Sequence, residues 1–368
     1  MTTDTHNSAH LENARPDPEQ KNNPVTDGST VPGGDAVAQQ SNLSSDLQPA
    51  SLISASCPVI FEGTVGYFTP PAPGSNSQDI AVLVIGAWGI EEMSSRRFMA
   101  SLCQGLAING MSSLRFDFPG TGDSLDTHDV SKGLSVWEDC ALQAADLLRT
   151  MSNCSRLVII SQSLGSALAV RLNARLAPVA AHVFVAPALS GRLFLRELAI
   201  WAKTIDNGLE LPEDQRDPSP GAIGGHKMPQ ELVRQVREIA ITAMDGQAPE
   251  KLLIMAPSQR AQDLELAEKL KNSGTDVRHI DFPDYPAMIS NMTYARVSMR
   301  AVETIVSWIT AIAKPSGSAM QTTLPEPDTL ALVGQDFTDR PVRFGENTHL
   351  SGFLCEPVHG ERKGTVLL

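Results

Sequence analysis

Residues 156–176 read RLVIISQSLGSALAVRLNARL, and the predicted architecture is built outward from them. The first part, RLVIIS, is a short apolar run of the kind found in strands that are buried on both faces of a sheet. From Leu164 to Leu176 the sequence has the spacing of a helix, which Pro178 terminates. The pattern therefore predicts a tight turn from strand to helix, with Ser163 in it.

Strand and helix patterns alternate on both sides of this stretch. Further apolar runs indicate strands at 80–86, 112–118, 182–187, 251–257 and 277–282, with two short strands around Gly63. Helical spacing occurs at 97–109, 137–151, 264–271 and 296–313. This alternation predicts a doubly wound α/β domain with a mostly parallel sheet. Residues 188–249 interrupt it with helix-like and Pro/Gly-rich pieces, which predicts a lid-like insertion over the sheet.

The segments outside the predicted domain differ from it in composition. Residues 1–54 are polar and rich in Pro and Gly, so we expect a disordered N-terminal tail. The α/β domain is expected at 55–314, and a Pro/Ser/Thr-rich linker at 315–333.

The last segment, residues 334–368, resembles the start of the domain. The sequence GFL at 352–354 matches GYF at 66–68, and the terminal VLL matches an apolar run in the strand at 80–86. We therefore expect the truncated start of a second repeat. Because a few uncovered strands leave edges unpaired, we also expect self-association through this segment.

Composition and charge exclude several classes of function. Of 368 residues, 42% are hydrophobic and 19% are charged, which is ordinary for a soluble globular protein. The formal charge of −13 disfavours a nucleic acid as partner, because phosphate binding needs clustered Lys and Arg. The five cysteines form no Cys-x-x-Cys pair, and we expect no metal, cofactor or disulfide framework. Neither a signal peptide nor a membrane span is recognisable, so the expected location is cytoplasmic.

Ser163 is the candidate nucleophile. A small-x-Ser-x-Gly sequence at a strand-to-helix turn holds the serine hydroxyl above the sheet, and small neighbours let the backbones approach closely. Ser161 stands where such turns usually have their first glycine. The alternative is an ordinary serine that caps the amides of a helix N-terminus. The strand and helix that flank Ser163 favour the nucleophile.

Two further motifs complete a resemblance to a known family. GAWG at 86–89 resembles the His-Gly-x-Gly loop of the α/β-hydrolase superfamily, and RFDFPGTGDS at 115–124 resembles its Arg-x-Asp-x-x-Gly-x-Gly-x-Ser stretch. Together with the turn at Ser163, these motifs make residues 58–314 similar to the esterase, thioesterase and serine-aminopeptidase-like branch. The resemblance implies an α/β-hydrolase fold. From the residues alone, 86–89 could be a simple tight turn, and we expect Asp117 to hold its loop in place.

The resemblance also implies an oxyanion hole and the rest of a catalytic triad. The oxyanion hole would be formed by the backbone N–H of Leu164 and that of Ala87 or Trp88. An acid should follow the strand at 251–257. Gln259 or Arg260 occupies its place, and the nearest carboxylate downstream, Asp263, is the candidate acid.

The histidine that would serve as general base is also missing from its usual place. The segment after the last strand, FPDYPAMISNMT at 282–293, contains no histidine, although a serine hydroxyl needs a base to become a good nucleophile. The candidate base is therefore His226 in the predicted insertion, with His279 in the last strand as the weaker alternative.

Two functions remain open from the sequence. The first is a serine hydrolase or acyltransferase that acts through Ser163 on the ester, thioester or amide of a small-molecule acyl substrate. The second is a catalytically inactive α/β-hydrolase-fold domain that binds a ligand or serves as a scaffold. The motifs favour the first function, and the missing histidine and acid favour the second.

Overall fold

The computed structural model describes residues 56–126, 129–242, 244, 248–257, 260–290, 293, 295–316, 331–344, 350–360 and 364. Its contacts divide the chain into Met1–Leu47 and Gln48–Leu368, and every described residue belongs to the second unit. The predicted tail at 1–54, most of the predicted linker and the terminal VLL at 366–368 lie outside the described residues.

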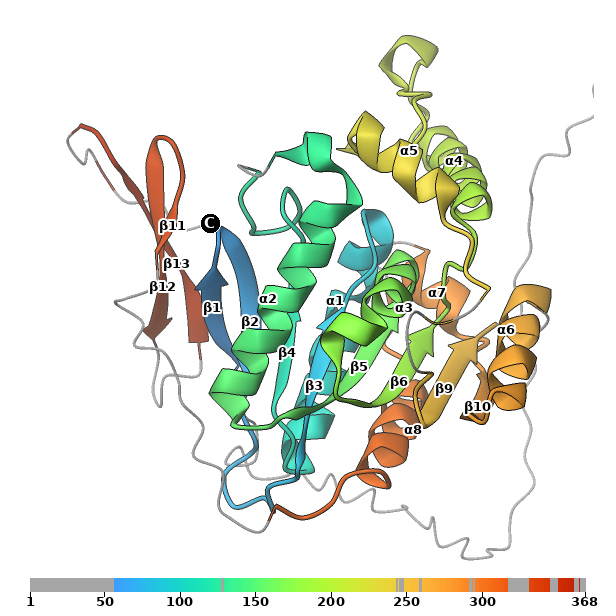
Figure 1. Ribbon diagram of the computed structural model, residues 1–368. Helices are drawn as coiled ribbons and strands as arrows, with labels where there is room; N and C mark the ends of the chain where they lie inside the picture. Colours follow the sequence, from blue (N-terminus) through green and yellow to red (C-terminus); the bar gives the residue numbers. More distant parts are fainter. Residues whose placement is uncertain are drawn as a thin grey trace, which may run out of the picture. The chain divides into compact units, whose positions relative to one another are not determined.

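An eight-stranded mixed sheet forms the centre of the domain (Figure 1). Neighbouring strands among β4, β3, β5, β6, β9 and β10 pair in parallel. Strands β1 and β2 pair antiparallel with each other, and β2 pairs antiparallel with β4, so they form an antiparallel edge. In spatial order, the strands are β1 (Cys57–Phe61), β2 (Thr64–Thr69), β4 (Ser113–Phe116), β3 (Ile80–Ile85), β5 (Arg156–Gln162), β6 (Val179–Val185), β9 (Lys251–Ala256) and β10 (Asp276–Asp281).

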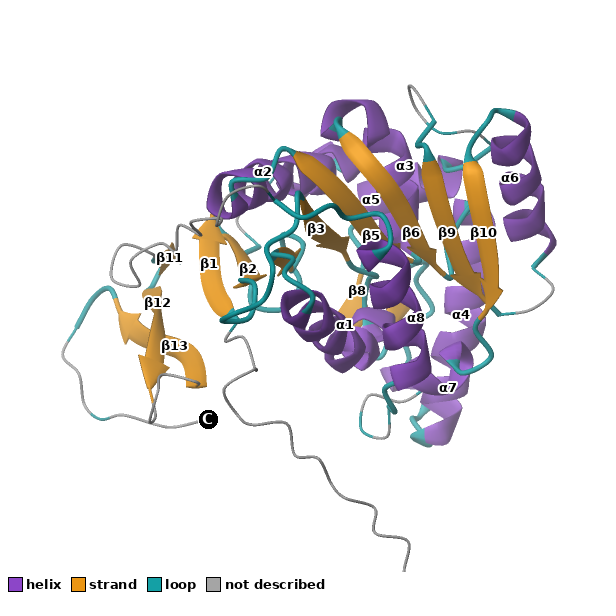
Figure 2. Cartoon of the chain, turned by 90° about the horizontal axis from the view of Figure 1, so that it is seen from below, coloured by secondary structure: helices purple, strands orange, loops and turns teal. Residues whose placement is uncertain are grey.

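Helices cover both faces of this sheet, as the two views show (Figures 1 and 2). The alternating side chains of β3 show why the strands are apolar throughout: Val82 and Val84 join one buried cluster, and Leu83 and Ile85 join the other. The first cluster includes α1 (Ile90–Ile108) and α8 (Met299–Thr310). The second includes α2 (Leu134–Ser152), α3 (Leu164–Leu176) and α6 (Ala261–Asn272). The predicted doubly wound α/β architecture is confirmed.

One helix begins earlier than predicted, and one short helix is additional. Helix α1 begins at Ile90 rather than at Arg97, because Gly89 adopts φ 68° and turns the chain directly into the helix. Glu91 therefore lies in the first turn, where a carboxylate is favoured by the helix dipole. The short helix α7 (Tyr285–Ile289) follows β10 and was not predicted. No helix in the described ranges combines the length and apolar character needed to cross a membrane.

The segment between β6 and β9 leaves the sheet and returns to it at one place. It contains α4 (Gly191–Gly208), η3 (Glu213–Gln215), β7 (Ala222–Ile223), β8 (His226–Lys227) and α5 (Gln230–Glu238). Its two ends are joined, because the N–H of Gly191 donates to the carbonyl of Ile239 at 2.9 Å and the N–H of Ile241 donates to that of Leu189 at 2.8 Å. That this segment acts as a lid stays a prediction.

A second, three-stranded antiparallel sheet contains β11 (Leu332–Val333), β12 (Phe337–Phe344) and β13 (Leu350–Pro357). Gly352 of β13 lies opposite Val342, just as Gly66 of β2 lies opposite Val59. The two segments that resemble each other in sequence thus both form antiparallel pairs. The second repeat itself stays a prediction.

The turn at Ser163 is held by contacts to neighbouring strands and loops. Ser163 has φ 50° and ψ −120°, a strained conformation for a residue other than glycine. Its N–H donates to the carbonyl of Val185 at 3.0 Å, and its carbonyl accepts from the N–H groups of Ser166 and Ala188, both at 3.0 Å. These bonds fix the strained backbone from three directions.

Gly165 brings the first turn of α3 against the end of β3. A Cβ atom added at Gly165 would overlap the carbonyl oxygens of Gly86 and Ile85, which belong to the backbone and cannot rotate away. The loop at 86–89 and the N-terminus of α3 are therefore direct neighbours.

Gly165→Ala should destabilise the fold. Because the added methyl group meets backbone atoms, we expect a loss of about 1–3 kcal/mol or more in the free energy of unfolding. Gly208→Ala is the control, since a Cβ at that helical position meets nothing within 4 Å. Urea denaturation of both variants checks the prediction. Equal stabilities would show that the two backbones are not in close contact.

Deletion of residues 317–368 should leave the melting temperature within a few degrees of that of the full chain. The physical reason is that both buried clusters are built from described residues up to Ala313. The shortened chain should also elute as a monomer in size-exclusion chromatography, whereas the full chain should self-associate. Loss of most of the stability would instead make the C-terminal segment an integral part of the first domain, and the predicted repeat would be wrong.

Candidate active site

Ser163 lines a cavity of about 450 Å³, which is within the range of small-molecule sites. The side chain is itself largely buried, with 4% of its residue surface exposed. One wall comes from α4 and is mainly apolar, with Leu193, Phe194, Leu198 and Trp201. The polar lining includes Glu91, Ser190, Glu197, Arg260, Gln262 and Tyr285. The cavity thus combines an apolar wall with charged groups next to the serine.

Glu91 is the carboxylate that contacts Ser163. It enters from the first turn of α1 and lines the same cavity as Ser163, and the interaction with the serine hydroxyl lowers the pKa of Glu91. Tyr285, from α7, donates its hydroxyl hydrogen to Oε1 of Glu91. The amide Nε2 of Gln162 in turn donates to the hydroxyl oxygen of Tyr285 at 3.0 Å. Four polar side chains from three separate parts of the sequence therefore form one buried cluster.

The protonation of this cluster is governed by burial. Desolvation raises the pKa of Glu91 above its ordinary value, and the hydrogen bonds from Ser163 and Tyr285 lower it by less. Desolvation also raises the pKa of Tyr285 well above its ordinary value, and the charge of Glu91 adds to this rise. Tyr285 is therefore a neutral hydrogen-bond donor at physiological pH.

The sequence did not reveal Glu91 and Tyr285 as site residues. Tyr285 lies on the segment after the last strand, which is where the family resemblance implied a histidine. The available signal was the position of that segment, because the family resemblance places a residue of the site there. Glu91 lies two residues after the GAWG loop at 86–89, and its signal was the pair of acidic residues that follows Ile90, which is typical of a helix first turn.

The predicted acid lies beside the cavity without lining it. Asp263 has no exposed surface, and one of its carboxylate oxygens lies 3.4 Å from Nε of Arg260. Burial raises the pKa of Asp263, and the charge of Arg260 partly opposes this rise. Arg260 itself lines the cavity and donates to the carbonyl of Pro187 at 3.0 Å. Gln259 lies outside the described residues.

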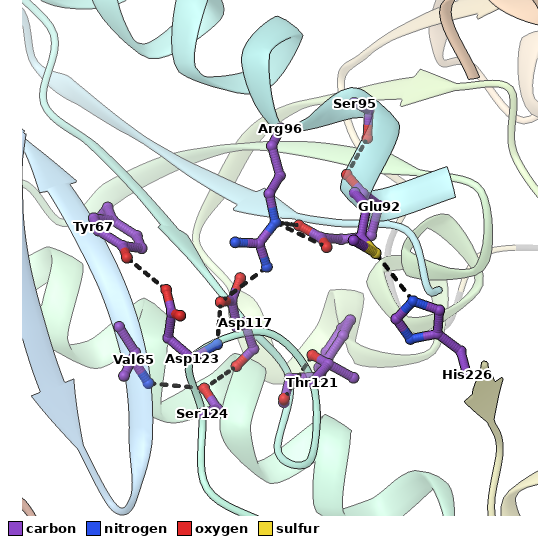
Figure 3. Close-up of polar contacts among 12 residues, drawn as sticks. Val65, Tyr67, Glu92, Ser95, Arg96, Asp117, Thr121, Asp123, Ser124 and His226 are labelled. Atoms are coloured by element: carbon purple, nitrogen blue, oxygen red, sulfur yellow. Dashed lines mark hydrogen bonds and ion pairs between the residues drawn. The ribbon is translucent and has the colours of Figure 1, made fainter. Parts of the chain in front are cut away.

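The predicted base, His226, lies next to the 86–89 loop. Nε2 of His226 is 3.0 Å from the sulfur of Met93 (Figure 3). The His226 ring lies 6.2 Å from that of Trp88, centroid to centroid. Burial lowers the pKa of His226. Neither His226 nor His279 is among the residues that line the Ser163 cavity, and the same holds for every described histidine.

Asp117 holds its loop in place, as expected (Figure 3). Its carboxylate accepts from the backbone N–H of Asp123 at 2.9 Å and from the guanidinium of Arg96 at 3.1 Å. The hydroxyl of Ser124 donates to the carbonyl of Asp117 at 2.7 Å and accepts from the N–H of Val65 at 2.8 Å. These bonds tie the 117–124 loop to α1 and β2, so its role is structural.

The backbone donors named for the oxyanion hole lie on adjacent segments. Leu164 is the first residue of α3, and an N–H in the first turn of a helix has no carbonyl partner within that helix. Ala87 and Trp88 belong to the loop that Gly165 contacts through Gly86.

Several solved structures are similar to this chain. Est1E from Butyrivibrio proteoclasticus is 15% identical, the match covers 70% of this chain and 99% of that protein, and the TM-score is 0.48. XC6422 from Xanthomonas campestris, an α/β serine hydrolase without a lid, is 15% identical and covers 70% and 94%, with a TM-score of 0.43. A soluble variant of monoglyceride lipase from Saccharomyces cerevisiae is 13% identical and covers 71% and 95%, with a TM-score of 0.45.

Assignment to a family depends on the sequence comparison. A search of curated proteins finds no match. The model of the alpha/beta hydrolase family matches residues 81–286, which is more than half of the chain and includes Ser163, Glu91 and Tyr285. The chain therefore belongs to the alpha/beta hydrolase family.

Proposed function

We propose that this protein is a serine hydrolase or acyltransferase that acts through Ser163 on the ester, thioester or amide of a small acyl substrate. The observation that carries the proposal is the strained turn that holds Ser163 in a cavity of about 450 Å³, in contact with a carboxylate. Membership of the alpha/beta hydrolase family supports a hydrolase function.

In the proposed reaction, the hydroxyl oxygen of Ser163 attacks the acyl carbon of the substrate. The new O–C bond forms as the carbonyl electrons move to oxygen, and the backbone N–H groups of Leu164 and of Ala87 or Trp88 stabilise this oxyanion. The intermediate then expels the alcohol, thiol or amine. Water or a second acceptor attacks the acyl group and releases it from Ser163.

The lining of the cavity suggests the kind of acyl group. Leu193, Phe194, Leu198 and Trp201 would be covered by an aliphatic or aromatic group of the substrate, which is a favourable contact because it removes apolar surface from water. Arg260 and Glu197 provide charges of both signs near this wall. We propose a substrate with an apolar acyl chain and a polar group within reach of Arg260.

A second candidate is a binding domain without catalysis. The observation that favours it is that no described histidine lines the cavity. Such a domain would bind an apolar ligand in the same cavity and would leave Ser163 unreactive.

Labelling with a fluorophosphonate separates the two candidates. We expect a phosphonylated Ser163 in the tryptic peptide 157–171 and slow hydrolysis of short-chain p-nitrophenyl esters. Ser163→Ala should abolish labelling and lower ester turnover by about 100-fold or more. Ser166→Ala is the control, because it removes a buried hydroxyl from the same peptide and leaves the nucleophile in place. If the wild-type protein stays unlabelled while it binds an apolar ligand, the protein is a binding domain without catalysis.

A further inference from the structure

We propose that Glu91 is the general base that activates Ser163, and that Tyr285 positions its carboxylate. This inference rests on the proposed function, in which Ser163 is the nucleophile. Glu91 would then do what a histidine does in a Ser-His-Asp triad, and Tyr285 would do what the aspartate does.

Contact with the nucleophile is the first argument. Glu91 lines the same cavity as Ser163, and its interaction with the serine hydroxyl lowers the Glu91 pKa, whereas no described histidine lines that cavity. A general base must lie within hydrogen-bond reach of the proton that it removes. Among the predicted candidates, His226 contacts Met93 and Asp263 pairs with Arg260.

The direction of the hydrogen bonds is the second argument. The amide Nε2 of Gln162 donates to the hydroxyl oxygen of Tyr285, so the hydroxyl hydrogen of Tyr285 is directed to Glu91. An ionised carboxylate can only accept, so in a hydrogen bond between Ser163 and Glu91 the serine hydroxyl is the donor. With Gln162 donating to Tyr285 and Tyr285 donating to Glu91, the carboxylate of Glu91 can accept the proton of the serine hydroxyl.

The position of the cluster in the fold is the third argument. Gln162 and Ser163 are consecutive at the end of β5, and Tyr285 stands on the segment where the family resemblance implied the histidine. Glu91 enters from the first turn of α1, directly after the loop with the proposed oxyanion donors. The proposed base, nucleophile and oxyanion donors therefore meet at one end of the parallel strands.

The charges around Glu91 suit this role. Burial raises its pKa, the hydrogen bonds from Ser163 and Tyr285 and the charge of Arg260 lower it, and the charge of Glu197 raises it further. A raised pKa brings a carboxylic acid closer to the working pH, where a base is most effective. Below that pKa, Glu91 is protonated and cannot accept the proton, so activity should rise as the pH rises through it.

The proposed step conserves atoms and charge. As the Oγ–C bond forms, the hydroxyl proton of Ser163 passes to Glu91, whose neutral carboxylic acid then gives it to the leaving oxygen, sulfur or nitrogen. The bond from the acyl carbon to that atom breaks. In the second half, water loses a proton to Glu91, and Ser163 regains one when the acyl group leaves.

The test uses the full chain and measures the rate of fluorophosphonate labelling as a function of pH. Glu91→Gln keeps the shape of the side chain and an acceptor for Tyr285 but removes the base, so we expect the rate to fall by about 10²–10⁴-fold. Glu92→Gln is the matched control, because Glu92 is the next residue, pairs with Arg96 and does not line the Ser163 cavity. Its rate should stay within about twofold of wild type, a factor too small to count as loss of a general base.

A positioning role for Tyr285 has its own readout. Tyr285→Phe removes a hydrogen bond that lowers the pKa of Glu91, so the midpoint of the pH profile should move upward. A purely structural role would lower the labelling rate at every pH without moving the midpoint. Because this variant keeps the aromatic ring, it tests the proposal even if Glu91→Gln fails to fold.

The possible outcomes separate a failure of the proposed base from a failure of the proposed function. If wild type is labelled at Ser163 and folded Glu91→Gln reacts at the same rate, Glu91 is not the base and the proposed function stands. A loss of labelling confined to His226→Gln would place the base where the sequence predicted it. If wild type is not labelled, the proposed function fails and the role of Glu91 fails with it.

Discussion

Close contact between the first turn of α3 and the end of β3 is the constraint on which the candidate site depends. Gly165 lies against the carbonyls of Ile85 and Gly86, and any side chain there would separate the two segments. The contact sets the distance between the loop at 86–89 and Ser163. It also determines where α1 can begin, because Gly89 turns the chain into that helix at the end of the same loop.

Most of the fold could be predicted from the sequence, because each of its main elements carries a local signal. Strand β5 is an apolar run that is buried on both faces, and α3 was predicted with the bounds that the structure gives it. The turn at Ser163 was recognisable because small residues at fixed spacing are a local requirement of that geometry. The short helix α7 has too few residues for a periodic pattern.

The candidate site was less predictable, because its polar contacts join segments that are distant in the sequence. Helix α1 was expected from Arg97, where its apolar spacing becomes regular, and this placed Glu91 in a loop. Nothing local to Tyr285 indicates a hydrogen bond to a residue far upstream. Glu91 is neither a histidine nor a carboxylate after one of the last two strands, so the family resemblance does not point to it.

The joined ends of the segment between β6 and β9 have an evolutionary consequence. Because Gly191 bonds to Ile239 and Ile241 bonds to Leu189, the segment leaves and rejoins the sheet through one narrow base. Such a segment can be exchanged, lengthened or shortened with little effect on the strands, because the entropic cost of closing a loop grows only slowly with its length. As α4 supplies the apolar wall of the cavity, a lineage could change what the cavity accepts by altering this one module, with the turn at Ser163 left untouched.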